Sequence, residues 1–247
     1  MNLKDKVAVI TGGTHGIGAA IALKLAREGS LVCLIARTDQ HTDIGEQIRK
    51  SGSAVEIICA DLSKEQACVE AMEEVIRRHG RVDILVHSAG SAAPGSLQEN
   101  ARDTWYTAFD IHIHAAYHLC RTAVPVMKQG GEGAILLISS AAGLRGVRNA
   151  LAYSVVKGAI PQMTRSLALE LSDFNIRVNC ISPGVIRTRF QDYLSPEQVK
   201  NNIENRIPLH REGTTEDVAD AAVMLIKNDF ITGENVVIDG GMTMRIV

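Results

Sequence analysis

Tyr153 and Lys157 lie four residues apart in a segment with helical spacing of apolar residues, so their side chains share one face of a helix, one turn apart. A free tyrosine hydroxyl has a pKa near ~10 and is a poor base at neutral pH. An ammonium group beside it favours the phenolate, and lowering the pKa by ~3 units needs ~4 kcal/mol, which close charges in a partly dry cleft can supply. The pair therefore predicts a group that exchanges a proton with a carbonyl or an alcohol.

Ser140 precedes Tyr153 by 13 residues and follows an apolar segment at 134–138 that we predict to be a strand. From the end of that strand its hydroxyl could polarise a substrate oxygen. The Tyr-x-x-x-Lys spacing alone occurs by chance in many helices. Combined with a serine at a strand end and with a glycine-rich turn near the N-terminus, it is a far more specific sign of one active site.

That glycine-rich turn spans residues 11–18, between an apolar, β-branched segment and a run of apolar residues at helical spacing that starts at Ile17. Gly12 would allow the tight turn out of the strand, Gly16 would let backbone N–H groups approach a pyrophosphate, and Gly18 would let the helix pack closely on the sheet. The helix N-terminus would then face the phosphates with unpaired donors and a partial positive charge. Strand, turn and helix together predict a nucleotide site rather than a simple turn.

Ala36 ends the second predicted strand, at 31–36, and Arg37 follows it. In nicotinamide-binding folds the end of this strand meets the adenosine ribose, where an acidic residue would bind the 2′-hydroxyl of NAD. A guanidinium in place of the acid suits a 2′-phosphate, through bidentate charge-assisted hydrogen bonds. The sequence therefore favours NADP(H) over NAD(H), and the alternative, an ordinary exposed arginine, stays open.

Strands and helices alternate along the rest of the chain. We expect strands at 55–59, 82–87, 134–138, 176–181 and 234–238, and helices at 42–51, 65–78, 102–128, 152–173 and 215–227. Ser63 with Gln66 fits a capping box, and Thr214 or Thr215 fits an N-cap. The alternation predicts an α/β fold, a doubly wound parallel sheet with helices on both faces, as a single domain over residues 1–247.

Composition narrows the class of protein. The 247 residues are 46% hydrophobic and 22% charged, with a net charge of −2, which gives no sign of a nucleic-acid partner. No apolar run approaches the ~20 residues that span a bilayer. The N-terminus lacks the layout of a signal peptide, and the five cysteines are scattered without a Cys-x-x-Cys motif. We therefore expect buried free thiols and a cytoplasmic protein.

The motifs resemble the short-chain dehydrogenase/reductase family over nearly the whole chain. The residues that match in order and spacing are Thr11 to Gly18, Asp61, Ala89-Gly90, Ser140, Tyr153, Lys157, Pro183-Gly184, Thr188, and the tail from Phe230-Ile-Thr-Gly233 to Asp239-Gly240-Gly241. The resemblance implies a Rossmann-type domain, hydride transfer at C4 of a nicotinamide, and a homotetramer built partly on the helix of Tyr153. The subgroup it resembles is that of bacterial 3-oxoacyl-carrier-protein reductases and related sugar or polyol dehydrogenases, so the substrate would be a small or carrier-linked carbonyl compound.

The resemblance also implies which residues bind the cofactor. Lys157 would bond the nicotinamide ribose, Asp61 the adenine amino group, and Ile186 with Thr188 the carboxamide. His15 would help to hold the 2′-phosphate. The implied set of cofactor-binding residues is Gly12, Thr14, His15, Gly16, Ile17, Gly18, Arg37, Asp61, Leu62, His87, Ala89, Gly90, Tyr153, Lys157, Pro183, Gly184, Ile186 and Thr188.

The sequence departs from the family pattern at points that concern the mechanism. His87-Ser88 replaces an Asn-Asn pair, and His112 stands where the family has an asparagine that holds a water next to the lysine. We assign His112 to this proton relay as a fourth catalytic residue, with a pKa near ~6.5, and a merely packed histidine is the alternative. Pro161 would remove a backbone donor and crowd the carbonyl of Lys157, at about 3 kcal/mol unless the helix bends.

Three further hypotheses concern ligands. His112, His114 and His118 do not share one face, so we expect no metal site. Residues 190–212, polar and irregular in pattern, would form a substrate lid. Four arginines in the loops after Ser140 and Pro183 would make a positive rim that favours an anionic substrate: Arg145, Arg148, Arg187 and Arg189.

A non-catalytic protein that binds NADP(H) as a sensor or scaffold is the alternative function. The intact set of Ser140, Tyr153 and Lys157 disfavours this alternative.

Overall fold

A seven-stranded parallel sheet forms the centre of the computed structural model, which describes residues 1–38, 43–100, 102–192 and 194–244. The strand order is β3-β2-β1-β4-β5-β6-β7, so the order reverses between β1 and β4. The strands are β1 (Val7–Thr11), β2 (Leu31–Ala36), β3 (Val55–Cys59), β4 (Ile84–His87), β5 (Gly133–Ile138), β6 (Ile176–Pro183) and β7 (Asn235–Ile238). The predicted fold class is confirmed.

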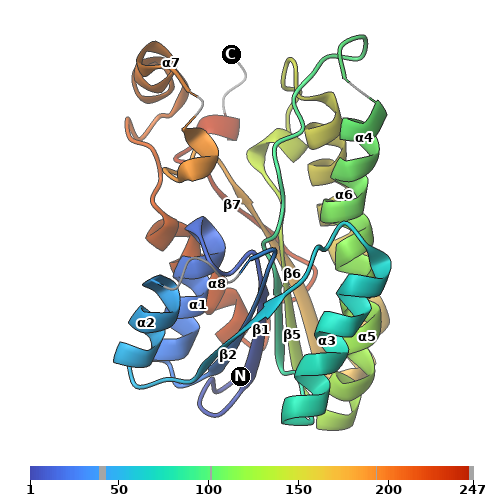
Figure 1. Ribbon diagram of the computed structural model, residues 1–247. Helices are drawn as coiled ribbons and strands as arrows, with labels where there is room; N and C mark the ends of the chain where they lie inside the picture. The colour runs from blue at the N-terminus through green and yellow to red at the C-terminus, as the bar shows by residue number, and fades with distance from the viewer. Residues whose placement is uncertain (39–42, 101, 193, 245–247) are drawn as a thin grey trace.

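Helices cover both faces of the sheet (Figure 1). On one face lie α1 (Gly16–Arg27), α2 (Asp43–Lys50) and α8 (Thr215–Lys227). On the other lie α3 (Glu65–His79), α5 (Ala115–Gly130) and α6 (Leu151–Leu171). The shorter α4 (Arg102–Phe109) and α7 (Pro196–Asn201) lie toward the end of the sheet where the strands finish.

The strands read as continuous apolar runs because both of their faces are buried. Along β1, Val7 and Val9 pack into the core under α3, α5 and α6, whereas Ala8 and Ile10 pack into the core under α1 and α8. The same alternation continues in β2 and β5. The sheet is therefore packed between two apolar cores, one on each face.

Three local predictions were wrong. The segment predicted as one helix at 102–128 is α4, a π-helical turn at Asp110–His114, and α5. Residues 190–212 are not irregular throughout, because α7 starts there at a capping box formed by Ser195 and Gln198. The predicted capping box of Ser63 does not form, since the Ser63 N–H and hydroxyl both donate to Asp61.

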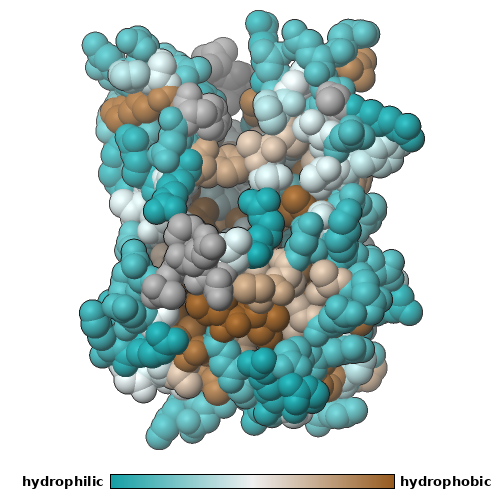
Figure 2. All heavy atoms as spheres, in the orientation of Figure 1, coloured by the Kyte–Doolittle hydropathy of each residue, from teal (hydrophilic) through white to brown (hydrophobic). Residues whose placement is uncertain are grey.

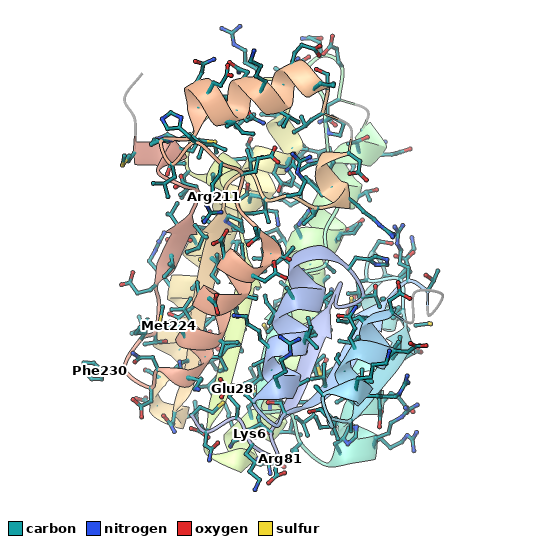
Figure 3. All side chains as sticks on the ribbon, turned by 90° about the vertical axis from the view of Figure 1, so that its left-hand side faces the viewer. Lys6, Glu28, Arg81, Arg211, Met224 and Phe230 are labelled. Atoms are coloured by element: carbon teal, nitrogen blue, oxygen red, sulfur yellow. The ribbon has the colours of Figure 1, made fainter. Side chains whose placement is uncertain are left out.

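The amino ends of β1 and β4 are tied together by one buried carboxylate. Asp83 accepts a hydrogen bond from the Val7 N–H at 2.9 Å, from Arg81 Nε at 2.8 Å, and pairs with Lys6 at 3.4 Å. Figure 3 shows Lys6 and Arg81 together at this end of the molecule. The carboxyl ends, at the opposite edge, are left for the functional loops.

Candidate active site

The loops that follow β1, β4 and β6 come into contact at the carboxyl edge of the sheet, and glycines allow it. A Cβ on Gly12 would lie 2.9 Å from Ala89 Cα, and one on Gly16 would lie 3.4 Å from the Thr188 methyl carbon. A Cβ on Gly18 would lie only 2.4 Å from the carbonyl oxygen of Gly12. Figure 2 shows the surface hollowed in its upper half, between the side of α7 and the side of α6.

Thr11 links β1 to the loop after β4, a role that the sequence analysis did not assign. Its Oγ1 accepts hydrogen bonds from the Ser88 and Ala89 N–H groups at 3.2 and 3.1 Å, and it bonds His87 Nδ1 at 2.9 Å. His87 Nε2 donates to the Ile111 carbonyl at 3.0 Å, so that nitrogen carries the proton and Nδ1 accepts from Thr11. Both ring nitrogens of His87 are therefore occupied within the protein.

The predicted contact of His87 with the cofactor stays a prediction, and the structure limits it to groups other than the two ring nitrogens. The side chain is buried, and burial lowers its pKa to about 4. A neutral, fully bonded imidazole holds the loop of Ala89 in place and offers no free donor to a ligand.

Lys157 is buried, with 6% of its surface exposed. Its Nζ donates to the carbonyl of Ile138 at 2.7 Å and lies 5.7 Å from the centre of the Tyr153 ring. Burial lowers the pKa of Lys157 to about 7. The lysine therefore exchanges its proton near neutral pH rather than far above it, which the sequence could not reveal.

Ser140 follows the strand that binds this lysine, and Tyr153 lies one helical turn before the lysine on α6. Ser140 is two residues beyond Ile138, and its Oγ accepts from the Ala142 N–H at 3.1 Å, which leaves the hydroxyl proton free to point elsewhere. The Tyr153 ring packs 6.0 Å from Phe190, centre to centre, and 6.0 Å edge-on from His112. Phe190 brings the segment after β6 to the tyrosine, a contact that the sequence did not predict.

The comparisons with known proteins agree with this arrangement. A family model described as enoyl-(acyl carrier protein) reductase matches residues 12–243. A 3-oxoacyl-[acyl-carrier-protein] reductase FabG of Chlamydia muridarum is 33% identical over 244 residues, covering 97% of this chain and 98% of its own. The chain belongs to the short-chain dehydrogenase/reductase family. This member is thus an NAD(P)-dependent oxidoreductase.

Two further relatives are similar over almost their whole length. An uncharacterised oxidoreductase of Mycobacterium tuberculosis is 36% identical over 246 residues, covering 98% of this chain and 93% of its own. The crystal structure of L-sorbose reductase from Gluconobacter frateurii, complexed with NADPH and L-sorbose, superposes with a TM-score of 0.93 at 29% identity, covering 100% of both chains. The similarity therefore extends to the fold as well as to the motifs.

His112, which stands where the family pattern has an asparagine, is buried in the π-helical turn. Its Nε2 lies 3.0 Å from the Ser91 carbonyl oxygen and 3.3 Å from the Ser91 nitrogen, and its buried Nδ1 has no hydrogen-bond partner among the described residues. Burial, followed by the charge of Lys157, holds the pKa of His112 well below its usual value. The expectation that it titrates near pH ~6.5 is therefore wrong, because a buried imidazole this close to a cation stays neutral.

The His112 ring also shapes the site. A Cβ on Gly90 would lie 2.3 Å from the ring carbon Cε1, so the glycine makes room for the larger side chain that replaces the family's asparagine. A π-helical turn inserts one extra residue into a helix and is common at functional sites. The unpaired Nδ1 is a ring nitrogen that a bound water could reach, and the place of His112 in a proton relay stays a prediction.

The residues around the glycine turn suit a dinucleotide. No side chain caps the N-terminus of α1, whose N-cap is His15, and no acidic residue lies in its first turn, so its N–H groups suit an anion. Thr14 Oγ1 bonds His15 Nδ1 at 3.0 Å, and Arg37 is exposed at the end of β2. When bound there, the cofactor would supply the hydride chemistry of its nicotinamide.

Other predicted cofactor residues have roles of their own in the fold. The Ser63 hydrogen bonds lower the pKa of Asp61, so this carboxylate is ionised. Leu62 is buried, and so is Ile186, whose side chain fills the space that a Cβ on Gly213 would take. These contacts are compatible with cofactor binding, which stays a prediction for each of these residues.

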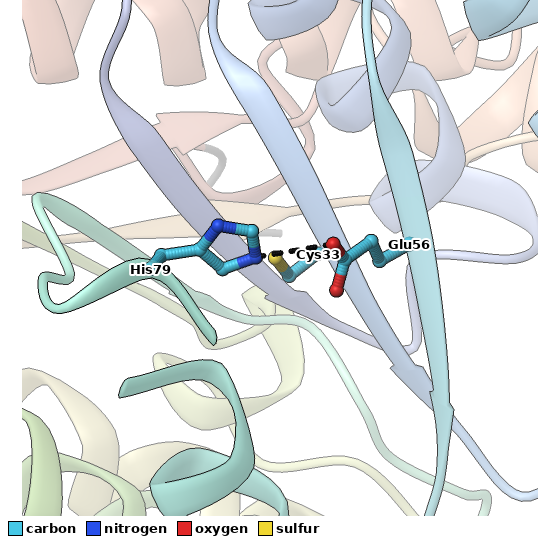
Figure 4. A group of neighbouring side chains, drawn as sticks. All are labelled: Cys33, Glu56 and His79. Atoms are coloured by element: carbon cyan, nitrogen blue, oxygen red, sulfur yellow. Dashed lines mark ion pairs between the residues drawn. The ribbon is translucent and has the colours of Figure 1, made fainter. Parts of the chain in front are cut away.

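Three other titratable side chains gather where β2 and β3 lie beside the end of α3 (Figure 4). Cys33, Glu56 and His79 place one ligand-type atom each within 4.8 Å of one another. Glu56 already pairs with Arg78 at 3.0 Å and with His79 at 3.3 Å, and burial raises the pKa of the Cys33 thiol to about 12. The ion pair of Glu56 with Arg78 therefore joins β3 to the end of α3, and Cys33 stays a neutral thiol beside it.

The three histidines considered for a metal bind separate partners. His112 bonds Ser91, His114 pairs with Asp110 at 2.9 Å, and His118 pairs with Glu65 at 3.6 Å. In the part of the chain that the structure describes, no helix has the length and apolar content needed to cross a bilayer.

The depressed pKa of Lys157 predicts a pH-dependent stability. Between pH ~7 and ~10 the unfolded chain holds a proton on this lysine that the folded chain lacks, so its contribution to the free energy of unfolding rises with pH, by roughly 1.4 kcal/mol per unit. The Lys157→Met variant lacks this term. We expect it to be more stable than the unsubstituted protein at pH 7, with the difference shrinking toward pH 10.5.

Urea unfolding at a series of pH values measures this difference. Lys50→Met, at a lysine whose side chain is 79% exposed, is the control and should show no such trend. Parallel stability curves for Lys157→Met and the unsubstituted protein would contradict the prediction.

Proposed function

We propose that this protein is an NADP(H)-dependent carbonyl reductase or alcohol dehydrogenase, which interconverts a ketone or aldehyde and the alcohol with a CH–OH group. The observation that carries the proposal is the gathering of Ser140, Tyr153 and Lys157 around the end of β5. The names of two relatives, a 3-oxoacyl-carrier-protein reductase and an L-sorbose reductase crystallised with NADPH, indicate the substrate classes to test first, 3-oxoacyl compounds and sugars or polyols.

Each residue of the set has a distinct task in this proposal. The Tyr153 hydroxyl donates the proton to the substrate carbonyl oxygen, and the Ser140 hydroxyl donates a hydrogen bond to the same oxygen. Protonated Lys157 stabilises the negative charge left on the tyrosine oxygen. A cofactor whose pyrophosphate is held by the glycine turn would supply the hydride from its nicotinamide.

A screen of aldehydes and ketones with NADPH and NADH, followed by the absorbance of the reduced nicotinamide, tests this function. We expect turnover of at least one substrate class, and a loss of roughly 100-fold or more in kcat for Tyr153→Phe. Tyr117→Phe, at a tyrosine that is 51% exposed, is the matched control. Tight binding of NADPH without turnover of any substrate would favour the sensor or scaffold instead.

The choice of cofactor is proposed to depend on Ala36 and Arg37. Replacing Ala36→Asp and Arg37→Leu together should move the preference toward NAD(H), because a ribose acceptor appears where the phosphate partner is lost. The ratio of kcat/KM for the two cofactors measures the change, and Arg27→Leu, an exposed arginine at the end of α1, is the control. A retained preference of about tenfold for NADP(H), or ~1.4 kcal/mol, would refute the role of Arg37.

The segment at 190–212 is proposed to be the substrate lid. Phe190 at its start packs against the ring of Tyr153. Farther along, Val199 and Ile203 line a hollow of about 560 Å³ together with Arg187. An apolar cover next to a polar site is typical of ligand pockets.

An anionic substrate is also proposed, either an acyl group on an acidic carrier or a sugar-acid-like molecule. Arg145, Arg148 and Arg189 are exposed on the loops beside the site. Arg187 differs from the expectation because it pairs with Glu212 at 2.5 Å, which cancels its charge. Among the described residues, the rim that supports the proposal therefore holds three arginines without a carboxylate partner rather than four.

The test compares kcat/KM for matched neutral and carboxylated ketones at low and high salt. We expect a preference for the anion that shrinks with salt and falls in Arg148→Ala, because screening removes long-range attraction. Arg165→Ala, an exposed position on α6, should leave it unchanged. Equal rates on both ketones at every salt concentration would exclude the idea.

We propose a cytoplasmic homotetramer. Tyr106, Tyr117 and Val155 are exposed on α4, α5 and α6, while Met224 and Phe230 are exposed on and after α8 (Figure 3). A closed tetramer with twofold symmetry needs two separate self-complementary faces of this kind. The five unpaired cysteines suit a reducing compartment.

A further inference from the structure

Pro161 lies inside α6, four residues after Lys157, and the helix runs through it. In a regular helix the N–H of residue 161 would donate to the carbonyl of Lys157. Proline has no N–H, so this carbonyl loses its partner within the helix. A buried carbonyl without a donor is unfavourable, so a replacement has to come from another element.

Ser139 supplies that replacement. Its Oγ donates to the Lys157 carbonyl at 2.7 Å, in a buried contact, and the serine itself is only 2% exposed. The preceding residue, Ile138, accepts the hydrogen bond from Lys157 Nζ, also at 2.7 Å. Ser139 therefore binds the backbone carbonyl of Lys157, and the adjacent Ile138 binds its side-chain ammonium group.

The turn after β5 packs closely against the peptide group between Lys157 and Gly158. A Cβ on Gly143 would lie 2.5 Å from the carbonyl carbon of Lys157 and 2.7 Å from the nitrogen of Gly158. This close approach keeps water away from the freed carbonyl. Ser139 is thus the donor that the local packing provides.

We propose that Ser139 is a positioning residue that replaces the backbone donor removed by Pro161 and so holds Lys157 in register with Tyr153 and Ser140. The kinetic part of this inference rests on the proposed function. The hydrogen bond itself can be tested by stability alone, so the two can fail separately.

We expect loss of the Ser139 hydrogen bond to change catalysis by moving the charge of Lys157 relative to Tyr153. The titratable groups that face this lysine are Tyr153 on its own helix, His87 at the end of β4 and His112 in the π-helical turn. Both histidines are neutral, so Tyr153 is the group that responds when Lys157 moves. A looser lysine stabilises the tyrosinate less, which moves the pH midpoint of kcat/KM toward alkaline pH.

A double-mutant cycle with Ser139→Ala and Pro161→Ala tests the proposal. Ser139→Ala alone should lower kcat/KM roughly tenfold or more, lower the melting temperature and shift the pH midpoint upward. In the Pro161→Ala background the new backbone N–H can serve the Lys157 carbonyl. There, Ser139→Ala should change kcat/KM less than about twofold and leave the melting temperature and the pH midpoint nearly unchanged.

Thr164→Val removes another buried hydroxyl from α6 and is the control, with the same effect expected in both backgrounds. Equal losses of stability for Ser139→Ala in both backgrounds would overturn the proposal. If no substrate is turned over, the proposed function fails, but the melting temperatures of the four proteins still decide whether Ser139 compensates for Pro161.

Discussion

A buried ammonium group is the constraint on which this site depends. Burial lowers the pKa of Lys157 to about 7, and its ammonium group donates to one backbone carbonyl oxygen in this buried position. That carbonyl belongs to Ile138, the last residue of a strand buried on both faces. The sheet therefore helps to set the position of the lysine, and the groups that face its charge come from β4, the π-helical turn and α6.

The end of β5 serves three purposes in three consecutive residues. Ile138 accepts from the ammonium group, Ser139 donates to the backbone of the same lysine, and Ser140 accepts from the Ala142 N–H with a hydroxyl proton that remains available. Three consecutive residues can make different contacts because successive side chains along a strand point in different directions. It also explains how α6 can contain a proline next to its catalytic face without losing its register.

The neighbouring strand ends are joined in a comparable way. Thr11 and His87 form a buried chain of hydrogen bonds that runs from β1 through β4 to the π-helical turn. That turn carries His112, whose neutral ring packs between Gly90 and Tyr153. Burial holds the pKa of this histidine well below its usual value, so the ring is neutral where it packs against these two residues.

The order of strands and helices, the glycine turn and the four-residue spacing of Tyr153 and Lys157 could all be predicted from the sequence. These features depend on the backbone geometry of residues close together in the chain, which local periodicity records. Burial and partners from distant elements were decided only by the tertiary structure. The pKa of Lys157 and of His112, the pairing of Arg187 with Glu212, and the bond from Ser139 to a carbonyl 18 residues away all depend on which surfaces the sheet brings together. The sequence showed that Pro161 would leave the carbonyl of Lys157 without its helical partner, and only the packed fold could show which donor takes that place.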